Sequence, residues 1–151
     1  MTSAKNEVII NQPIAVIWDF VKEMDNWAPL VPGYISHEKV NERQSQWTFR
    51  EDVGILKKKV TMLITIKEWI EPTKVTFDLK GINENMTGKG YFLAEALDKN
   101  KTKMSGYLEM TAEGPLAGII NAVLKTSVPK KGEEMTAAIS AKLMELKPTR
   151  L

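Results

Sequence analysis

The chain has 151 residues, the size of one ordinary domain, and 43% of them are hydrophobic, which excludes an intrinsically disordered chain. Lys and Arg number 21 against 19 Asp and Glu, so the charge gives no reason to expect a nucleic-acid partner. The lack of cysteine excludes disulfides, thiolate nucleophiles and Cys-ligated metals, and a single histidine, His37, disfavours a His-rich metal site. We therefore expect one domain over residues 1–151 that uses no metal and no cofactor.

The sequence shows neither an export signal nor a membrane span. Its first apolar stretch, Val8–Ile10, is far shorter than the apolar region of a signal peptide. The longest charge-free runs are well below the roughly 20 apolar residues that a spanning helix needs. We therefore expect a cytoplasmic protein with no transmembrane segment.

The chain opens with a short strand and a helix. The segment Asn6–Ile10 is typical of a strand. Proline suits the first turn of a helix, and apolar residues recur at helical spacing behind it, so Pro13–Met24 is predicted as an amphipathic helix. Asp25–Gly33 is predicted as a short helical or looped passage that ends at Pro32-Gly33.

Six strands are predicted next. In the longest of them, the even positions from Val60 to Ile66 are apolar, so the sheet has one dry face and one wet face. The polar residues on the other face are Lys57, Lys59, Thr61, Thr65 and Lys67. Short polar turns between successive strands predict an antiparallel meander. The predicted strands are Tyr34–Val40, Gln46–Val53, Ile55–Ile70, Lys74–Lys80, Met86–Leu97 and Thr102–Glu113.

After Gly114-Pro115 the apolar residues return to helical spacing, which predicts a long C-terminal helix. Pro129 and Gly132 are expected to break or kink it. One long helix against one face of a curled antiparallel sheet is a two-layer α+β fold. We expect about seven strands wrapped around that helix, with one or two short helices after the first strand.

The last two strands carry small side chains on their predicted dry face. A helix packed on such a face leaves space, and because native interiors are close-packed, neighbours, water or a ligand must fill it. Glycines inside strands also mark bulges where a sheet bends around a helix, and that alternative stays open. The small residues are Gly88, Gly90, Ala94, Ala96, Gly106 and Ala112.

No pair of catalytic groups emerges from the sequence. Histidine is the residue type most often used as a general base, so His37 is a candidate, but its strand alternates too poorly to fix the direction of the side chain. A lone histidine in a strand is more often a surface or bridging residue. The neighbouring carboxylates Glu51-Asp52 face opposite ways in a strand, and Glu133-Glu134 suits a helix start, so both pairs are interpreted as structural.

Lys57-Lys58-Lys59 is a basic run of three residues at the start of a strand. A period of two puts Lys58 on the dry face, where its ammonium must reach the rim or meet a carboxylate. Our hypothesis is that Lys58 sits at a cavity mouth and pairs with an acidic ligand head group. The alternative interpretation is a solvated strand end.

Several short motifs recur in the order and spacing of a known superfamily. They are Ile17-Trp18, Leu30-Val31-Pro32-Gly33, Val53-Gly54, Gly88-Lys89-Gly90, Lys101-Thr102 and Gly114-Pro115-Leu116-Ala117-Gly118. Together, from about Glu7 to Leu146, they resemble the helix-grip fold of the START and birch-pollen-allergen superfamily, also called SRPBCC. Within it, the chain is most similar to the CoxG-like branch, which is named after a protein of the carbon monoxide dehydrogenase system.

The resemblance implies an apolar cavity between the sheet and the C-terminal helix that holds a lipid, quinone, steroid or polyketide. CoxG-like proteins are thought to assist the assembly or membrane recruitment of a redox enzyme, so a redox enzyme is a candidate partner. Because the sequence stops at Leu151 without an extra hydrophobic tail, stable membrane attachment is not expected.

The tryptophans are assigned different places. Trp18 is expected in the core, and Trp69 on the wet face near a strand end, covering the sheet edge. Trp27 falls in the segment that in this fold rims the cavity entrance, and Trp47 is expected to line the interior. The expected cavity lining is Trp27, Trp47, Phe49, Met62, Ile64, Phe77, Phe92, Met104, Leu108, Met110, Ile120, Met135 and Ile139, and the expected mouth is Pro32, Gly33 and Lys58.

Three functions fit this sequence. The first is a non-catalytic binding or carrier protein for an apolar small molecule, and we favour it. The second is a polyketide cyclase or dehydratase in the same cavity, which requires at least two convergent polar groups. The third is an assembly or co-chaperone-like module, which predicts a filled core and an exposed apolar patch near Trp27–Tyr34.

Overall fold

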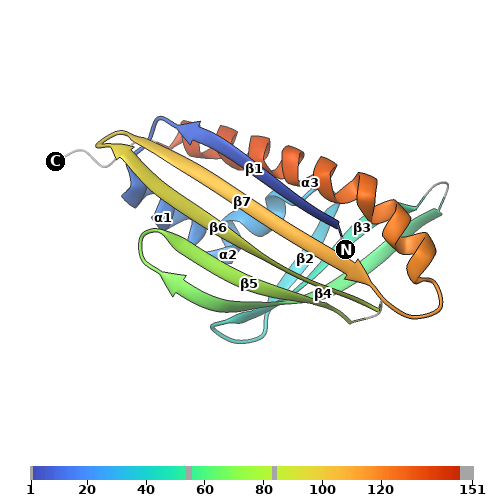
Figure 1. The fold of residues 1–151 in the computed structure, drawn as a ribbon. Helices are drawn as coiled ribbons and strands as arrows, with labels where there is room; N and C mark the ends of the chain where they lie inside the picture. Colours follow the sequence, from blue (N-terminus) through green and yellow to red (C-terminus); the bar gives the residue numbers. More distant parts are fainter. Residues whose placement is uncertain (1, 54–55, 83–84, 147–151) are drawn as a thin grey trace.

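The protein folds into a curved antiparallel sheet that wraps along one long helix (Figure 1). The computed structural model describes residues 2–53, 56–82 and 85–146, and of residues 51–53 and 56–58 it describes only the backbone. Within these ranges the sheet has seven strands in the order β1-β7-β6-β5-β4-β3-β2. The predicted α+β fold is therefore confirmed. The strands are β1 (Thr2–Ile10), β2 (Tyr34–Lys39), β3 (Gln44–Val53), β4 (Leu56–Ile70), β5 (Lys74–Gly81), β6 (Met86–Asp98) and β7 (Lys101–Ala112).

The first strand is longer and the first helix shorter than predicted. β1 begins at Thr2, because residues 2–10 pair in unbroken register with β7. The helix α1 spans Ile14–Val21 and ends before Met24, which starts a second, four-residue helix, α2 (Met24–Trp27), followed by a 3-10 turn, η1 (Ala28–Leu30). Side chains satisfy the last carbonyls of α1, since Asn26 Nδ2 donates to Phe20 O and Trp27 Nε1 donates to Val21 O. This capping explains why the helix predicted to reach Met24 ends at Val21, while the presence of two short helices here agrees with the expectation.

A bulge in β4 reverses the predicted orientation of Trp69. The register between β4 and β5 shifts between Ile66 and Glu68, so that Trp69 pairs with the buried Val75. Paired residues in an antiparallel sheet share a face, so Trp69 lies on the inward face and packs against the core. The predicted wet face for Trp69 is therefore wrong, because one extra residue shifts the side-chain alternation by one position.

The helix α3 (Ala117–Glu145) lies across the inward face of the sheet and contacts mainly β1 and β7 (Figure 1). Pro129 lies inside this helix without ending it, so the predicted break is wrong. Proline removes the hydrogen bond to the carbonyl four residues earlier, here that of Lys125. Both Pro129 and Lys125 are exposed, which lets water reach the freed carbonyl.

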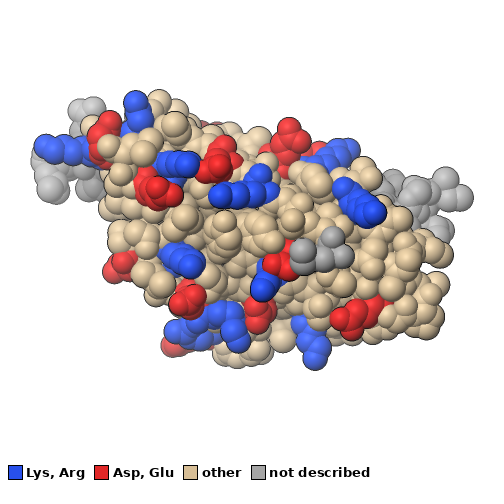
Figure 2. Space-filling model, viewed as in Figure 1, with Lys and Arg blue, Asp and Glu red and all other residues tan. Residues whose placement is uncertain are grey.

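Part of the core lies where α1, the C-terminal end of β1 and the last turns of α3 meet. Ile10, Ile17 and Leu143 are completely buried there. Gln12 joins the elements, because its Nε2 donates to Leu143 O at 2.8 Å and its backbone carbonyl accepts from Thr102 Oγ1 at 2.9 Å. Charges of both signs are interspersed over the face shown in Figure 2, in keeping with the small net charge. None of the helices in the described part of the chain is long and apolar enough to cross a membrane.

Candidate functional site

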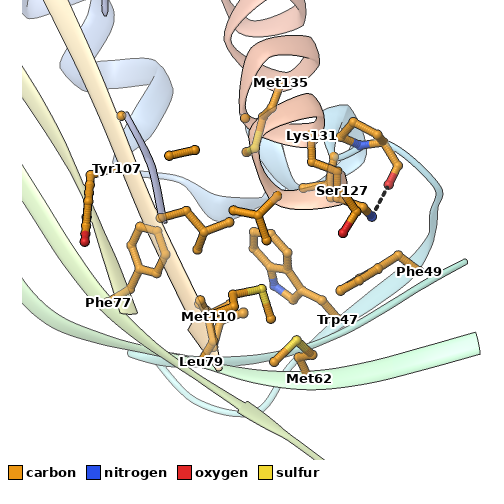
Figure 3. Close-up of a pocket in the computed structure, with 18 of the residues that line it drawn as sticks. Trp47, Phe49, Met62, Phe77, Leu79, Tyr107, Met110, Ser127, Lys131 and Met135 are labelled. Atoms are coloured by element: carbon orange, nitrogen blue, oxygen red, sulfur yellow. Dashed lines mark hydrogen bonds between the residues drawn. The ribbon is translucent and has the colours of Figure 1, made fainter. Parts of the chain in front are cut away.

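A cavity of about 410 Å³ lies between the sheet and α3 (Figure 3). Its volume falls within the roughly 300–1,000 Å³ typical of small-molecule sites. Apolar side chains from β3 to β7 form its floor, and the inward side of α3 forms its roof. The structure places all thirteen predicted lining residues along this cavity, and their part in binding a ligand stays a prediction.

Sequence reasoning missed several residues of the cavity wall. Ala4 of β1 was outside the predicted strand, and its alternation with the exposed residues of β1 was the available signal. Leu79 continues the apolar alternation of β5 and could have been included on that ground. Ser127 and Lys131 of α3 are polar, so an apolar stripe gave no reason to choose them.

The inward glycines have two different roles. A Cβ atom added at Gly106 would meet nothing within 4 Å, so this glycine leaves room in the cavity wall. A Cβ at Gly90 would meet the carbonyl oxygen of Tyr107 and come within 2.7 Å of the Phe77 ring, and one at Gly88 would meet the carbonyl oxygen of Glu109. Gly88 and Gly90 therefore allow close approach of neighbouring chain segments, whereas Gly106 supplies space. The pairing of β6 with β7 runs without a shift past all three glycines, so none of them marks a bulge.

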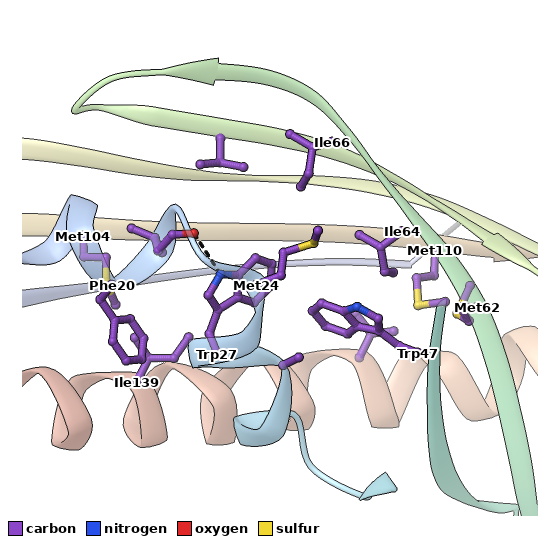
Figure 4. Packing of buried hydrophobic residues seen from close by; sticks show 14 of the residues in the cluster. Phe20, Met24, Trp27, Trp47, Met62, Ile64, Ile66, Met104, Met110 and Ile139 are labelled. Carbon is purple, nitrogen blue, oxygen red and sulfur yellow. Dashed lines mark hydrogen bonds between the residues drawn. The ribbon is translucent and has the colours of Figure 1, made fainter. Parts of the chain in front are cut away.

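Two tryptophans form an aromatic wall inside the cavity. Trp27 and Trp47 are buried, and their rings meet edge to face with centroids 5.1 Å apart (Figure 4). Trp27 therefore lies in the interior rather than at the expected rim. Its Nε1 donates to Val21 O at 2.9 Å, whereas Trp47 Nε1 is buried with no hydrogen-bond partner among the described residues. A buried donor of this kind favours a bound acceptor beside it, from a ligand or a water molecule.

A second hollow lies outside the cavity and shares five lining residues with it, so we call it the mouth. Pro32 and Gly33, two of the residues predicted for the mouth, line this hollow, and Gly33 adopts φ +83°, a conformation that favours glycine. Their part in ligand entry stays a prediction. The side chain of Lys58 lies outside the described residues. The shared residues are Pro32, Ile119, Val123, Ser127 and Lys131.

His37 lies on the inward face of the edge strand β2, paired in register with Trp47. Its Nε2 lies 2.7 Å from Asp25 Oδ1 and its Nδ1 lies 2.6 Å from the Tyr34 hydroxyl. The three side chains thus form a polar chain that ties α2 to β2. None of the three is among the residues that line the described cavity.

The resolved electrostatic shifts lie on the sheet rather than at the mouth. The Lys103 ammonium, 2.8 Å from Glu7 Oε2, holds the pKa of Glu7 below its usual range, and Glu7 in turn raises the pKa of Lys103. Burial raises the pKa of Tyr107, and its hydrogen bond to Glu109 acts in the same direction. Among residues 2–53, 56–82 and 85–146, no group of three or more His, Asp or Glu side chains could hold a metal ion.

Comparisons with known proteins support the architecture over almost the whole chain. A protein-family model matches residues 1–147, and no curated protein matches the sequence significantly. Among solved structures, a conserved protein from Geobacillus kaustophilus aligns with a TM-score of 0.79 and 12% identity, covering 95% of each chain. A START superfamily protein from Mycobacterium smegmatis aligns with a TM-score of 0.71 and 11% identity, covering 97% of this chain and 100% of that one. The Zhui aromatase/cyclase from Streptomyces sp. R1128 aligns with a TM-score of 0.66 and 11% identity, covering 93% and 92%.

Proposed function

We propose that this chain, which shares the helix-grip fold of a START superfamily protein, binds or carries a hydrophobic small molecule without catalysing a reaction. The ligand, of a lipid, quinone or polyketide kind, occupies the cavity between the sheet and α3. The observation that carries this proposal is the cavity itself, about 410 Å³ of space walled by apolar side chains. Each square ångström of apolar ligand surface removed from water contributes about 25 cal/mol before the ordering costs of binding.

The polar groups of the cavity support a carrier more than an enzyme. A cyclase or dehydratase needs at least two polar groups that converge on the substrate. The described lining contains no histidine or carboxylate to act as an acid or base, and its one charged side chain, Lys131, lies with Ser127 at the mouth. His37, with Asp25 and Tyr34, lies outside the lining. The likeness to the Zhui aromatase/cyclase is one of fold at 11% identity and adds no catalytic residue.

The same structure gives less support to an assembly module. That function predicts a filled core and an exposed apolar patch around Trp27, whereas Trp27 is buried and faces a cavity. The likeness to the CoxG-like branch, a redox-enzyme partner and a cytoplasmic location stay predictions from the sequence.

Native mass spectrometry of the freshly purified protein, compared with the denatured protein, tests this function. We expect an adduct of a few hundred daltons that denaturation releases, and saturable uptake of the neutral apolar dye Nile red. Gly106→Leu should weaken dye uptake, because its side chain enters open space in the cavity wall. The matched control is Ala96→Leu, an exposed position on the neighbouring strand that does not line the described cavity. A protein that carries no adduct and takes up no dye would contradict the proposal.

A further inference from the structure

The mouth of the cavity carries a positive charge next to an apolar interior. Lys131 is the one charged side chain among the described residues of the cavity wall, and it also lines the mouth. Its Nζ lies 3.3 Å from the carbonyl oxygen of Pro32 and 4.7 Å from the centre of the Phe49 ring. These contacts hold the ammonium at the boundary between the cavity and the mouth, because Pro32 lines both and Phe49 lines the cavity.

A hydroxyl group stands beside this ammonium. Ser127 precedes Lys131 by four residues on α3, so the two side chains project from the same helix face (Figure 3). Ser127 Oγ is buried and has no hydrogen-bond partner among the described residues, although the residue lines both the cavity and the mouth. A buried hydroxyl without a partner is costly, so an acceptor placed between Ser127 and Lys131 gains a hydrogen bond and a charge contact together.

The described charged side chains around the mouth carry a net positive charge, as Lys131 itself does. Arg50 of β3 and Lys130 of α3 line it with Lys131, and Glu134 is the one carboxylate among its described residues. An excess of cations at the entrance of a low-dielectric cavity attracts anions and orients an amphipathic molecule with its charged end outward.

We propose that the ligand is a long-chain carboxylate whose tail fills the cavity. Its carboxylate lies at the mouth, where it accepts a hydrogen bond from Ser127 Oγ and pairs with the ammonium of Lys131. This inference rests on the proposed function and names the ligand class of the same cavity. It assigns to Lys131, on the helix, the part that the sequence suggested for Lys58, on the sheet.

Binding of dodecanoic acid and of dodecanol, measured by displacement of Nile red at about pH 8, tests the head-group contact, because only the acid is ionised there. We expect the protein to bind the acid about tenfold more tightly than the alcohol, the size expected for a hydrogen-bonded charge contact. Lys131→Met should bring the two affinities close together without weakening the alcohol. Lys131→Arg should keep the preference, and Ser127→Ala should reduce it by a smaller factor.

The control variant is Lys125→Met, an exposed position on the same helix that lines neither the described cavity nor the mouth. It should leave both affinities unchanged. Equal binding of acid and alcohol by the unaltered protein would overturn the carboxylate assignment and leave the carrier function standing. Failure of the protein to bind either compound or Nile red would instead overturn the carrier function, so the two failures are distinguishable. If Lys131→Met does not fold, as shown by circular dichroism, Lys131→Gln and the unaltered protein's own preference provide the test.

Discussion

The two ends of α3 lie against different kinds of interior. Near its C-terminal end Leu143 is completely buried and packs in one cluster with Ile17 of α1, which we call the packed end. Near its N-terminal end Ile119 is 64% exposed and Ile120 is half-buried, and both line the cavity, which we call the hollow end. One helix therefore takes part in a close-packed core and in the wall of a cavity.

This difference shows how a small domain keeps an open cavity. Space inside a protein costs stability, because the atoms around it lose neighbours. The packed end compensates for that loss with completely buried side chains and with the hydrogen bonds of Gln12, which link β1 to α3 and β7. At the hollow end, Gly106 leaves space, and Ser127 and Trp47 carry buried polar atoms that have no partner among the described residues.

The largest expected effect compares one isoleucine from each end. Ile17→Ala should lower the free energy of unfolding by about 2–5 kcal/mol, because Ile17 is completely buried and its removal opens a new cavity. Ile120→Ala should cost roughly 1 kcal/mol, because that side chain is half-buried against existing space. Both residues lie in helices, so the change in helix propensity is the same. Urea unfolding followed by circular dichroism measures the two values, and equal losses would show that both ends are packed alike.

A smaller effect is expected for the glycines on the inward face. Gly90→Ala should destabilise the protein by about 1–3 kcal/mol, because its Cβ would press on the Tyr107 carbonyl and the Phe77 ring. Gly106→Ala should stay within about 0.5 kcal/mol of the unaltered protein, because its Cβ enters open space. Thermal unfolding of the two variants measures both changes in stability. A large loss at Gly106 would mean that the hollow end is filled in solution by neighbouring side chains.

Much of this architecture could be predicted from the sequence, because alternation and turn chemistry act locally. The meander from β2 to β7, the long C-terminal helix and the inward face of β6 and β7 follow from such patterns, and so do wall residues such as Met62 and Met110. The pairing of β1 with β7 joins segments far apart in the sequence, so local patterns do not predict it. The orientation of Trp69 could not be predicted, because a bulge leaves the residue types of β4 unchanged while shifting their alternation. The early end of α1 could not be predicted either, since it depends on side chains of Asn26 and Trp27 that return to cap it.

The polar residues of the site were the hardest part to predict. Lys131 becomes a mouth residue because the last loop before β2 brings Pro32 against α3, a contact between residues far apart in the sequence. In the sequence, the run Lys57-Lys58-Lys59 is the more visible basic feature, and it suggested Lys58 as the cation at the mouth. Which cation faces the cavity depends on packing between segments far apart in the sequence, and local residue patterns do not reveal such packing.

The smallest expected effect concerns the two indoles that meet inside the cavity. Trp27→Phe removes the hydrogen bond from Nε1 to Val21 O, which ties the cavity wall to the packed end, whereas Trp47→Phe removes a buried donor that has no partner among the described residues. Because the two changes remove similar apolar area, Trp27→Phe should cost about 1 kcal/mol more than Trp47→Phe, the net value of one hydrogen bond. Urea unfolding of the ligand-free protein, followed by far-ultraviolet circular dichroism, gives both values without relying on tryptophan fluorescence. Equal losses would mean that Trp47 Nε1 already bonds to ordered water in the empty cavity, and a ligand would then have to displace that water to bind. A smaller loss at Trp47 would identify the hollow end as dry and its indole as a donor held ready for the ligand.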